Sequence, residues 1–130
     1  MEKITDMSKK KITPQSAKAK GRRLQQWVCS KISELTGYEW GSNGEDYAIE
    51  SRPMGQSGTD VRMESHVLKK FPFSVEAKAV EKIAIPQWIR QAEENKIEGT
   101  DWLLVCKQSR KKAIVIMDAE RFFELLKNYK

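Results

Sequence analysis

The sequence predicts an α/β fold in which helices flank a mixed β-sheet, with the elements in the order α-βββ-α-ββ-α. Three observations predict it. Apolar residues recur at helical spacing over residues 15–36, apolar and polar residues alternate over 72–80, and residues 101–107 are continuously apolar in the middle. The last pattern is typical of a central strand that is covered on both faces.

The positive charge of the chain lies at one end. The chain has 130 residues and a formal net charge of +6, which is enough for one domain with one core. Residues 1–23 carry eight positive and two negative side chains, whereas the remainder carries 16 of each sign. We therefore expect a flexible basic arm over 1–13 and a single folded domain over 14–130. The arm either binds an acidic partner or is a solvated tail that aids solubility.

Several classes of protein are disfavoured by the composition. No apolar run approaches the length of a membrane span, which is about 18 residues or more, and the N-terminal lysines precede no apolar stretch of a secretory signal. Cys29 and Cys106 lie in apolar runs, which is typical of reduced core thiols and predicts a cytoplasmic protein. With one histidine, His66, the chain offers little for a structural zinc site.

The first predicted element is the helix over 15–36, which Gly37 should end. Lys18, Arg22 and Arg23 lie in its first half and extend the basic arm onto an ordered element. Its apolar face is formed by Leu24, Trp27, Val28, Ile32 and Leu35.

Two short strands with a glycine-rich turn between them should follow a loop over 38–46. The strands cover 47–52 and 59–63, and the turn covers 53–58. This turn lacks the Gly-Lys-Ser/Thr sequence of a P-loop. A polar connector over 64–71 leads to the second half of the chain.

The second half begins with the alternating strand over 72–80, which has one apolar face and one face with two charges. A helix over 84–97, the strand over 101–107, a strand over 113–117 and a helix over 119–128 follow. Asp118 should cap the last helix. The side chains expected on the buried face of the first helix are Ile85, Trp88, Ile89 and Ala92. Those expected on the buried face of the second are Phe122, Phe123, Leu125 and Leu126.

The aromatic and basic residues outside these faces have two interpretations each. We expect Trp27, Trp88 and Trp102 in the core, whereas Trp40, in a glycine-containing loop, is a candidate for stacking on a base. The basic turn over 109–112 either contacts phosphates or is a solvated hairpin tip.

The pattern that carries chemistry is Gly58-Thr59-Asp60, followed 16 residues after Asp60 by Glu76-Ala77-Lys78. Glu76 and Lys78 are two apart on a strand, so they project to the same side. If Asp60 lies on the neighbouring strand, the two carboxylates can meet across the strand spacing of about 5 Å. Taken singly, such charges are common on the exposed face of a strand.

Converging carboxylates repel each other unless a cation lies between them. Mg²⁺ or Mn²⁺ is the expected cation, because both prefer oxygen ligands. Asp60 and Glu76 are the candidate metal ligands, and the carbonyl of Ala77 could add a third oxygen. Lys78 places a positive charge beside the metal, where it can orient water or stabilise a phosphate.

This pattern resembles the PD-(D/E)XK nuclease superfamily, and within it the phage-type and archaeal-type Holliday junction resolvases. The matching segments lie within residues 20–107 and are 20–27, 52–60 and 71–78. The resemblance implies a restriction-endonuclease-like core, a nuclease domain over 14–130, and Mg²⁺-dependent or Mn²⁺-dependent cleavage of DNA. It also implies that Asp60 and Glu76 hold the metal and that Lys78 is the catalytic lysine.

The resemblance further suggests Ser57 as a contact near the scissile phosphate. Gln25 stands where many such resolvases have a glutamate that joins the metal site, so Gln25 could only position water or a phosphate. Gln91 could also face the site. The residues expected to contact DNA are Lys9, Lys10, Lys11, Lys18, Lys20, Arg22, Arg23 and Gln56.

The first hypothesis is therefore a structure-specific endonuclease that resolves Holliday junctions as a homodimer, because two symmetric cuts call for a twofold axis. For a phage-encoded protein this would occur in the cytoplasm of the host cell. A second hypothesis keeps the enzyme but makes it a nicking or restriction-like nuclease of phage DNA. A third is a DNA-binding protein with an inactive nuclease fold, in which Gln25 reflects decay of the site.

Overall fold

Helix α2 (Pro14–Thr36) opens the part of the chain that the computed structural model describes, which is residues 13–42, 46–53 and 58–129. The side chain of Thr13 accepts a hydrogen bond from the backbone of Ser16 and caps the first turn. Gly37 ends the helix in the left-handed region, with φ of 84°, and donates to the carbonyl of Ser33. The helix predicted over 15–36 is confirmed with its stop signal. The predicted arm lies outside the described residues, except for Thr13.

A three-stranded sheet follows, with the order β1-β2-β3. Strand β1 (Trp40–Ser42) runs parallel to β2 (Ile49–Ser51), which is antiparallel to β3 (Val61–Met63). The loop predicted over 38–46 was wrong in its first half, which contains β1. Trp40 is partly buried against the core there, because the parallel pairing with β2 turns this short segment inward.

The connector predicted over 64–71 was also wrong, because helix α3 (Ser65–Lys70) occupies most of it. Val67 is its buried residue and packs into the main core. Six residues are too few to show a full helical period among polar neighbours, and one buried contact is enough to fix the turn.

The second sheet has the order β4-β5-β6. Strand β4 (Phe73–Ala79) is parallel to β5 (Asp101–Lys107), helix α4 (Ile85–Asn95) connects them, and β6 (Ile114–Ile116) is antiparallel to β5. The single mixed sheet that the sequence predicted is therefore two mixed sheets of three strands each. They meet where the backbone N–H of Asp60 donates to the carbonyl of Val75.

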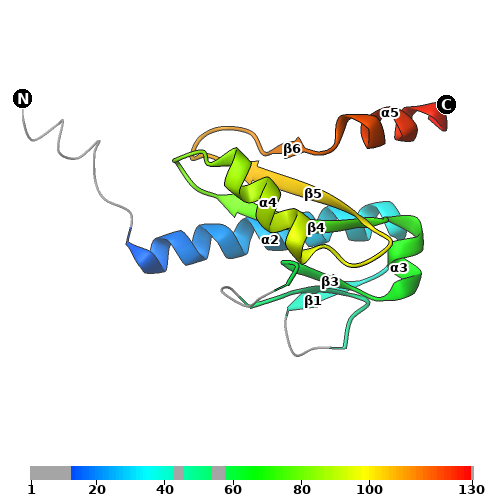
Figure 1. Cartoon of the computed structure of the whole chain (residues 1–130). Coiled ribbons are helices and arrows are strands. Elements are labelled where there is room, and N and C mark those ends of the chain that lie inside the picture. The colour runs from blue at the N-terminus through cyan, green and yellow to red at the C-terminus, as the bar shows by residue number, and fades with distance from the viewer. Residues whose placement is uncertain (1–12, 43–45, 54–57, 130) are drawn as a thin grey trace, which may run out of the picture.

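Helices α2 and α4 cover opposite faces of the β4-β5-β6 sheet (Figure 1). Alternate residues of β5 enter two different cores: Leu103 and Val105 pack on the α2 side, and Leu104 and Cys106 on the α4 side. The prediction that this strand is covered on both faces is confirmed.

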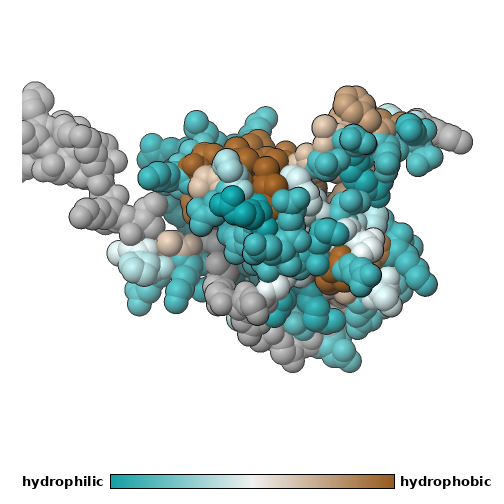
Figure 2. Space-filling model, viewed as in Figure 1, coloured by the Kyte–Doolittle hydropathy of each residue, from teal (hydrophilic) through white to brown (hydrophobic). Residues whose placement is uncertain are grey.

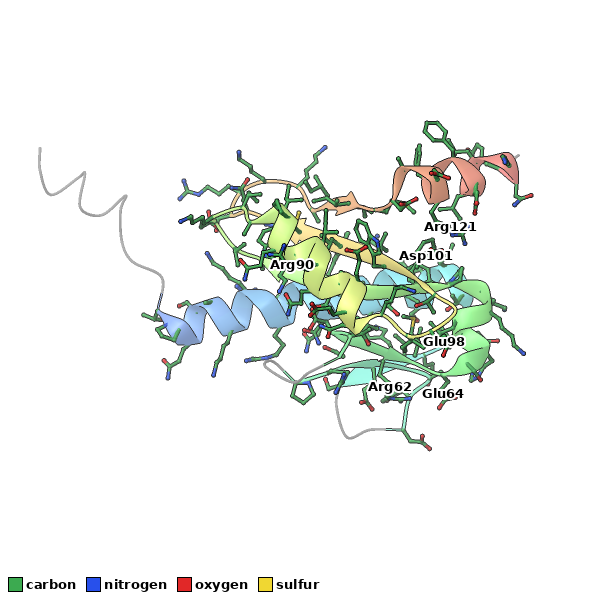
Figure 3. The ribbon with its side chains drawn as sticks, viewed as in Figure 1. Arg62, Glu64, Arg90, Glu98, Asp101 and Arg121 are labelled. Carbon is green, nitrogen blue, oxygen red and sulfur yellow. The ribbon has the colours of Figure 1, made fainter. Side chains whose placement is uncertain are left out.

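Helix α5 (Ala119–Lys127) is capped by Asp118 as predicted, but its apolar residues do not dock it. The helix has no buried residue and projects beyond the body of the molecule (Figure 1). Its contact with the body is made by Arg121, whose Nε lies 2.6 Å from Asp101 Oδ2 (Figure 3). Figure 2 shows apolar atoms on this helix and over the N-terminal end of α4.

Two further expectations about the core have opposite outcomes. Trp88 is buried as predicted, whereas Trp27 is 47% exposed, so its prediction as a core residue was wrong.

Cys29 and Cys106 are buried free thiols, and burial raises the pKa of Cys29 to about 12. The thiol of Cys29 therefore stays protonated at neutral pH, as expected of a reduced core cysteine.

Candidate metal site on two strands

Strand β4 carries Glu76 and Lys78 on the side that faces α4, because Glu76 is in register with Leu104 of the α4-side core. Strand alternation placed Glu76 on a solvent-facing or half-buried side of the strand, but Glu76 is only 2% exposed. Ser74, two residues earlier on the same side, is equally buried and shares a hydrogen bond with Thr100. The polar face of this strand is thus an interior surface under α4 and the segment that follows it.

Asp60 lies directly before β3 and beside β4. Its backbone N–H donates to Val75, and its Oδ2 accepts a 2.7 Å hydrogen bond from the backbone N–H of Ala77. These two bonds bring the Asp60 carboxylate next to the carboxyl group of Glu76, close enough for the two groups to affect each other's ionisation. The structure therefore brings together the two residues that the sequence singled out as metal ligands.

The electrostatics of this pair are unfavourable for two negative charges. Burial raises the pKa of Asp60, although the N–H of Ala77 acts in the other direction. Burial, followed by repulsion from Asp60, raises the pKa of Glu76 to about 7. Below about pH 7 the pair therefore tends to hold a proton, and a cation at the same place would take over its role.

Two amide side chains of helix α4, one helical turn apart, form hydrogen bonds to the two charged side chains of β4. Asn95 Nδ2 donates to Glu76 Oε1 at 2.9 Å, and Lys78 Nζ donates to Gln91 Oε1 at 2.8 Å. Gln91 faces the site, which the sequence had suggested only as a possibility. Asn95 was missed, although its i, i+4 spacing from Gln91 puts both amides on one helix face and could have indicated it.

Gln25 is a buried residue of α2 that holds the backbone of the site. Its Nε2 donates to the carbonyl oxygens of Arg52 and Asp60, both at 2.6 Å, and the side chain is 2% exposed. The amide thus ties together the two ends of the glycine-rich turn. The structure places this nitrogen on the main chain of Asp60, which makes Gln25 a positioning residue.

Gly58 allows the turn before Asp60 to close. Its φ is 90°, and a Cβ at this position would lie 2.6 Å from Nη1 of Arg52. That guanidinium donates to the carbonyl of Thr59, and its charge lowers the pKa of Asp60 slightly against the effect of burial. The positive φ favours a glycine here, because L side chains rarely adopt it, and a Cβ would also displace the tip of Arg52. Ser57 and Gln56 lie outside the described residues.

The basic residues predicted to contact DNA lie on the first half of α2. Lys18, Arg22 and Arg23 are exposed, and Lys20 donates to Ser109 Oγ at 2.8 Å. Helix α2 thus meets the basic turn between β5 and β6. Lys9, Lys10 and Lys11 lie outside the described residues.

The donor set fits a hard cation with few protein ligands. Among the described residues, no group of three or more His, Cys, Asp and Glu side chains could hold a metal. Two carboxylates remain, and Mg²⁺ is commonly bound by one or two carboxylates while substrate oxygens and water complete its shell.

No protein-family model, curated protein or solved structure matches this chain. In the described part of the chain, no helix has both the length and the apolar character needed to cross a bilayer.

Proposed function

We propose that this protein is a divalent-metal-dependent DNA endonuclease with a restriction-endonuclease-like core, and that it cuts branched DNA such as a four-way junction. The observation that carries the proposal is the pair formed by the half-buried Asp60, directly before β3, and the buried Glu76 of β4, with Lys78 beside them. A fold places two interacting carboxyls in its interior at a cost, which a bound cation offsets.

Asp60 and Glu76 would hold Mg²⁺ or Mn²⁺, and the Ala77 carbonyl is the third candidate ligand. When bound, such an ion supplies a Lewis acid that lowers the pKa of water and stabilises charge on a phosphate. The reaction is hydrolysis. Water oxygen attacks phosphorus in line, the bond to the 3′ oxygen breaks, and the products are a 5′-phosphate and a 3′-hydroxyl.

The remaining side chains orient these groups. Lys78, held by Gln91, places its ammonium beside the carboxylates, where it can pair with a phosphate oxygen as negative charge develops. Asn95 fixes one oxygen of Glu76, and the other oxygen would be available to a cation. Gln25 fixes the backbone of Asp60 from behind.

The positive charge of α2 supports a nucleic acid as the substrate. Lys18, Arg22 and Arg23 extend from consecutive turns of one helix, and such cations bind DNA by releasing its counterions. Affinity for DNA should accordingly fall steeply as salt is raised. Together with residues 1–12, whose charge is known from the sequence, this helix would hold the arms of a branched substrate.

A homodimer is part of the proposal, because a junction is cut at two symmetric positions. The C-terminal segment supports it: Ile114 and Val115 of β6 and Phe122, Phe123 and Leu126 of α5 are all exposed. An edge strand and a projecting helix with such residues are typical of a surface that a second copy covers.

The test is Mg²⁺-dependent cleavage of a panel of DNAs of common sequence: a four-way junction, a three-way junction, a linear duplex and a single strand. We expect paired cuts in the junction and at least about tenfold slower cleavage of the duplex. Equal cleavage of junction and duplex would favour a nicking or restriction-like nuclease. Tight binding with no metal-stimulated cleavage of any substrate would favour a DNA-binding protein with an inactive site.

A further inference from the structure

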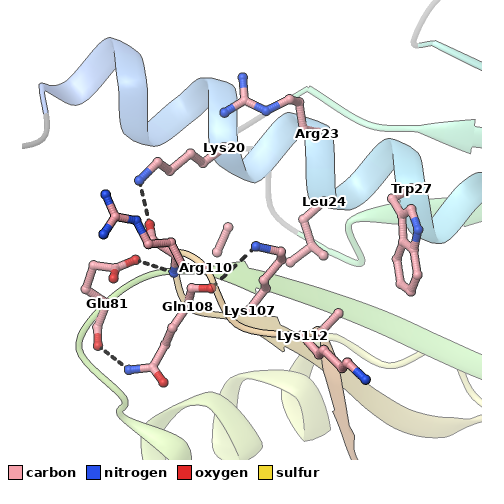
Figure 4. Close-up of a pocket in the computed structure, with 12 residues that line it drawn as sticks. Lys20, Arg23, Leu24, Trp27, Glu81, Lys107, Gln108, Arg110 and Lys112 are labelled. Carbon is pink, nitrogen blue, oxygen red and sulfur yellow. Dashed lines mark hydrogen bonds between the residues drawn. The ribbon is translucent and has the colours of Figure 1, made fainter.

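A second site lies on the face of the β4-β5-β6 sheet that α2 covers. It is a pocket of about 640 Å³ between the first half of α2, the end of β4 and the turn between β5 and β6 (Figure 4). Its wall includes Ala79, whereas the preceding residue, Lys78, faces the carboxylate pair on the other side of the strand. The pocket is thus separate from the candidate metal site but adjoins it along β4. Its volume lies in the range of small-molecule sites.

The lining of this pocket is strongly positive. Five cationic side chains line it together with a single carboxylate, that of Glu81. The cations are Lys20, Arg23, Lys107, Arg110 and Lys112.

The single carboxylate does not neutralise these cations. Glu81 accepts a 2.9 Å hydrogen bond from the backbone of Ser109, and this bond lowers the pKa of Glu81. Among the described residues, no ion pair joins Arg23, Arg110 or Lys112 to a carboxylate. The pocket therefore has an excess of positive charge that an anion would balance.

An exposed indole adjoins these cations. Trp27 lies one helical turn after Arg23, lines the pocket and is 47% exposed. Trp is among the least favourable side chains to leave in water, and its flat face stacks well on a nucleobase. A nucleotide carries a phosphate and a planar base on its sugar, and the pocket offers a partner to the phosphate and to the base.

We propose that this pocket binds an unpaired nucleotide of a DNA strand, with its phosphate on the cations of α2 and the β5–β6 turn and its base against Trp27. A duplex cannot offer this contact, because its bases are stacked inside, whereas a single-stranded flap or end at a branch point exposes them. The inference shares its DNA ligand with the proposed function but does not use the carboxylates, so either can fail alone.

The test measures binding in EDTA, so that cleavage plays no part. Fluorescently labelled oligo(dT), a duplex of equal length and dTMP are titrated with the full chain at fixed salt. We expect Trp27→Ala to weaken oligo(dT) binding at least about fivefold, and Trp27→Phe, which keeps an aromatic ring, to change it less than twofold. Duplex binding should change less than twofold in both. Leu35→Ala, at an exposed position of the same helix, is the matched control and should resemble the wild type.

Three outcomes would overturn the proposal. Equal losses on oligo(dT) and duplex would mean that Trp27 supports the fold or the general DNA surface. Oligo(dT) that binds no more tightly than dTMP would assign the pocket to free nucleotides. A shift in sedimentation coefficient with Trp27→Ala and unchanged DNA affinity would mean that the indole packs against a second copy of the chain.

Discussion

Gln25 shows how one atom decides what a position can do. Its Nε2 donates to two backbone carbonyls inside the protein, and a glutamate at this position has no N–H with which to make these bonds. The presence of glutamine here, where the resolvases proposed as its family often have glutamate, therefore has a structural reason that the sequence did not reveal. In this chain the residue supports the Asp60 backbone, and the proposed metal site is left with two carboxylates.

Replacing Gln25 with glutamate should destabilise the protein, because a buried carboxylate would face two carbonyl oxygens. We expect a loss on the order of 2–4 kcal/mol in the free energy of unfolding, measured by urea denaturation. Gln26→Glu, at a half-buried neighbouring position, is the control and should cost less than about 1 kcal/mol. A Gln25→Glu protein with wild-type stability and tighter Mg²⁺ binding would show that this position belongs to the metal site.

Glu76 makes the stability of the metal-free protein depend on pH. Its pKa is about 7 in the folded protein and near 4.3 in an unfolded chain, so the folded state binds the proton more tightly. The stability that this group contributes should therefore be fully present below about pH 4, fall as pH rises to about 7, and change little above that. Thermal unfolding in EDTA across this range measures it.

Two comparisons assign the pH effect to this pair. Glu76→Gln should flatten the decline between pH 5 and 7, because its amide cannot ionise. Saturating Mg²⁺ should also reduce the decline in the wild type, since the cation stabilises the ionised carboxylates. A decline that persists unchanged in both experiments would place the titrating group elsewhere.

Long helices and strands, in which apolar residues recur regularly over many positions, could be predicted from the sequence. Short elements could not. Helix α2 and strand β5 match the residues expected for them to within one position, because many buried contacts share one period. Strand β1 and helix α3 have three and six residues, and tertiary contacts alone decide their conformation. The convergence of Asp60 and Glu76 was foreseen, but the two-sheet arrangement and the partners Asn95 and Gln91 depend on packing that no local pattern contains.

Helix α5 is the element whose prediction was wrong in the most informative way. Its apolar spacing is that of a docked helix, yet Phe123 is 62% exposed and Arg121 provides the anchor to the body. If a second copy of the chain covers α5, the apolar spacing of this helix correctly indicates a buried face. The proposed homodimer accounts for a feature that one chain leaves unexplained.

Phe123→Glu should weaken the dimer, because a carboxylate replaces an apolar ring on the proposed interface. We expect the wild type to sediment as a dimer at micromolar concentration and the variant to dissociate at concentrations at least about tenfold higher. Lys127→Ala, an exposed position on the same helix, should leave the association unchanged. A wild-type chain that is still monomeric at a concentration about 100-fold above micromolar would contradict this assignment of α5.

Across the whole molecule, charge and chemistry are separated. The excess positive charge lies in residues 1–23. Among the described cations there, Lys20 and Arg23 line the pocket beside Trp27, whereas Lys18 and Arg22 are exposed elsewhere on α2. The carboxylate pair lies on the other face of β4, under α4. Binding and cleavage should therefore respond to different substitutions: cations of α2 govern affinity and its salt dependence, whereas Asp60 and Glu76 govern the chemical step.

The measurement that tests the central claim most directly is single-turnover cleavage of a four-way junction by Asp60→Asn in Mg²⁺, with junction affinity measured in parallel in Ca²⁺ or EDTA. Asparagine keeps the size of the side chain and removes the charge that the cation needs. We predict that cleavage falls at least about a thousandfold while affinity stays within threefold. Glu94→Gln, an exposed carboxylate of α4, should cut like the wild type. Cleavage by Asp60→Asn at the wild-type rate would contradict the assignment of this pair as the metal site.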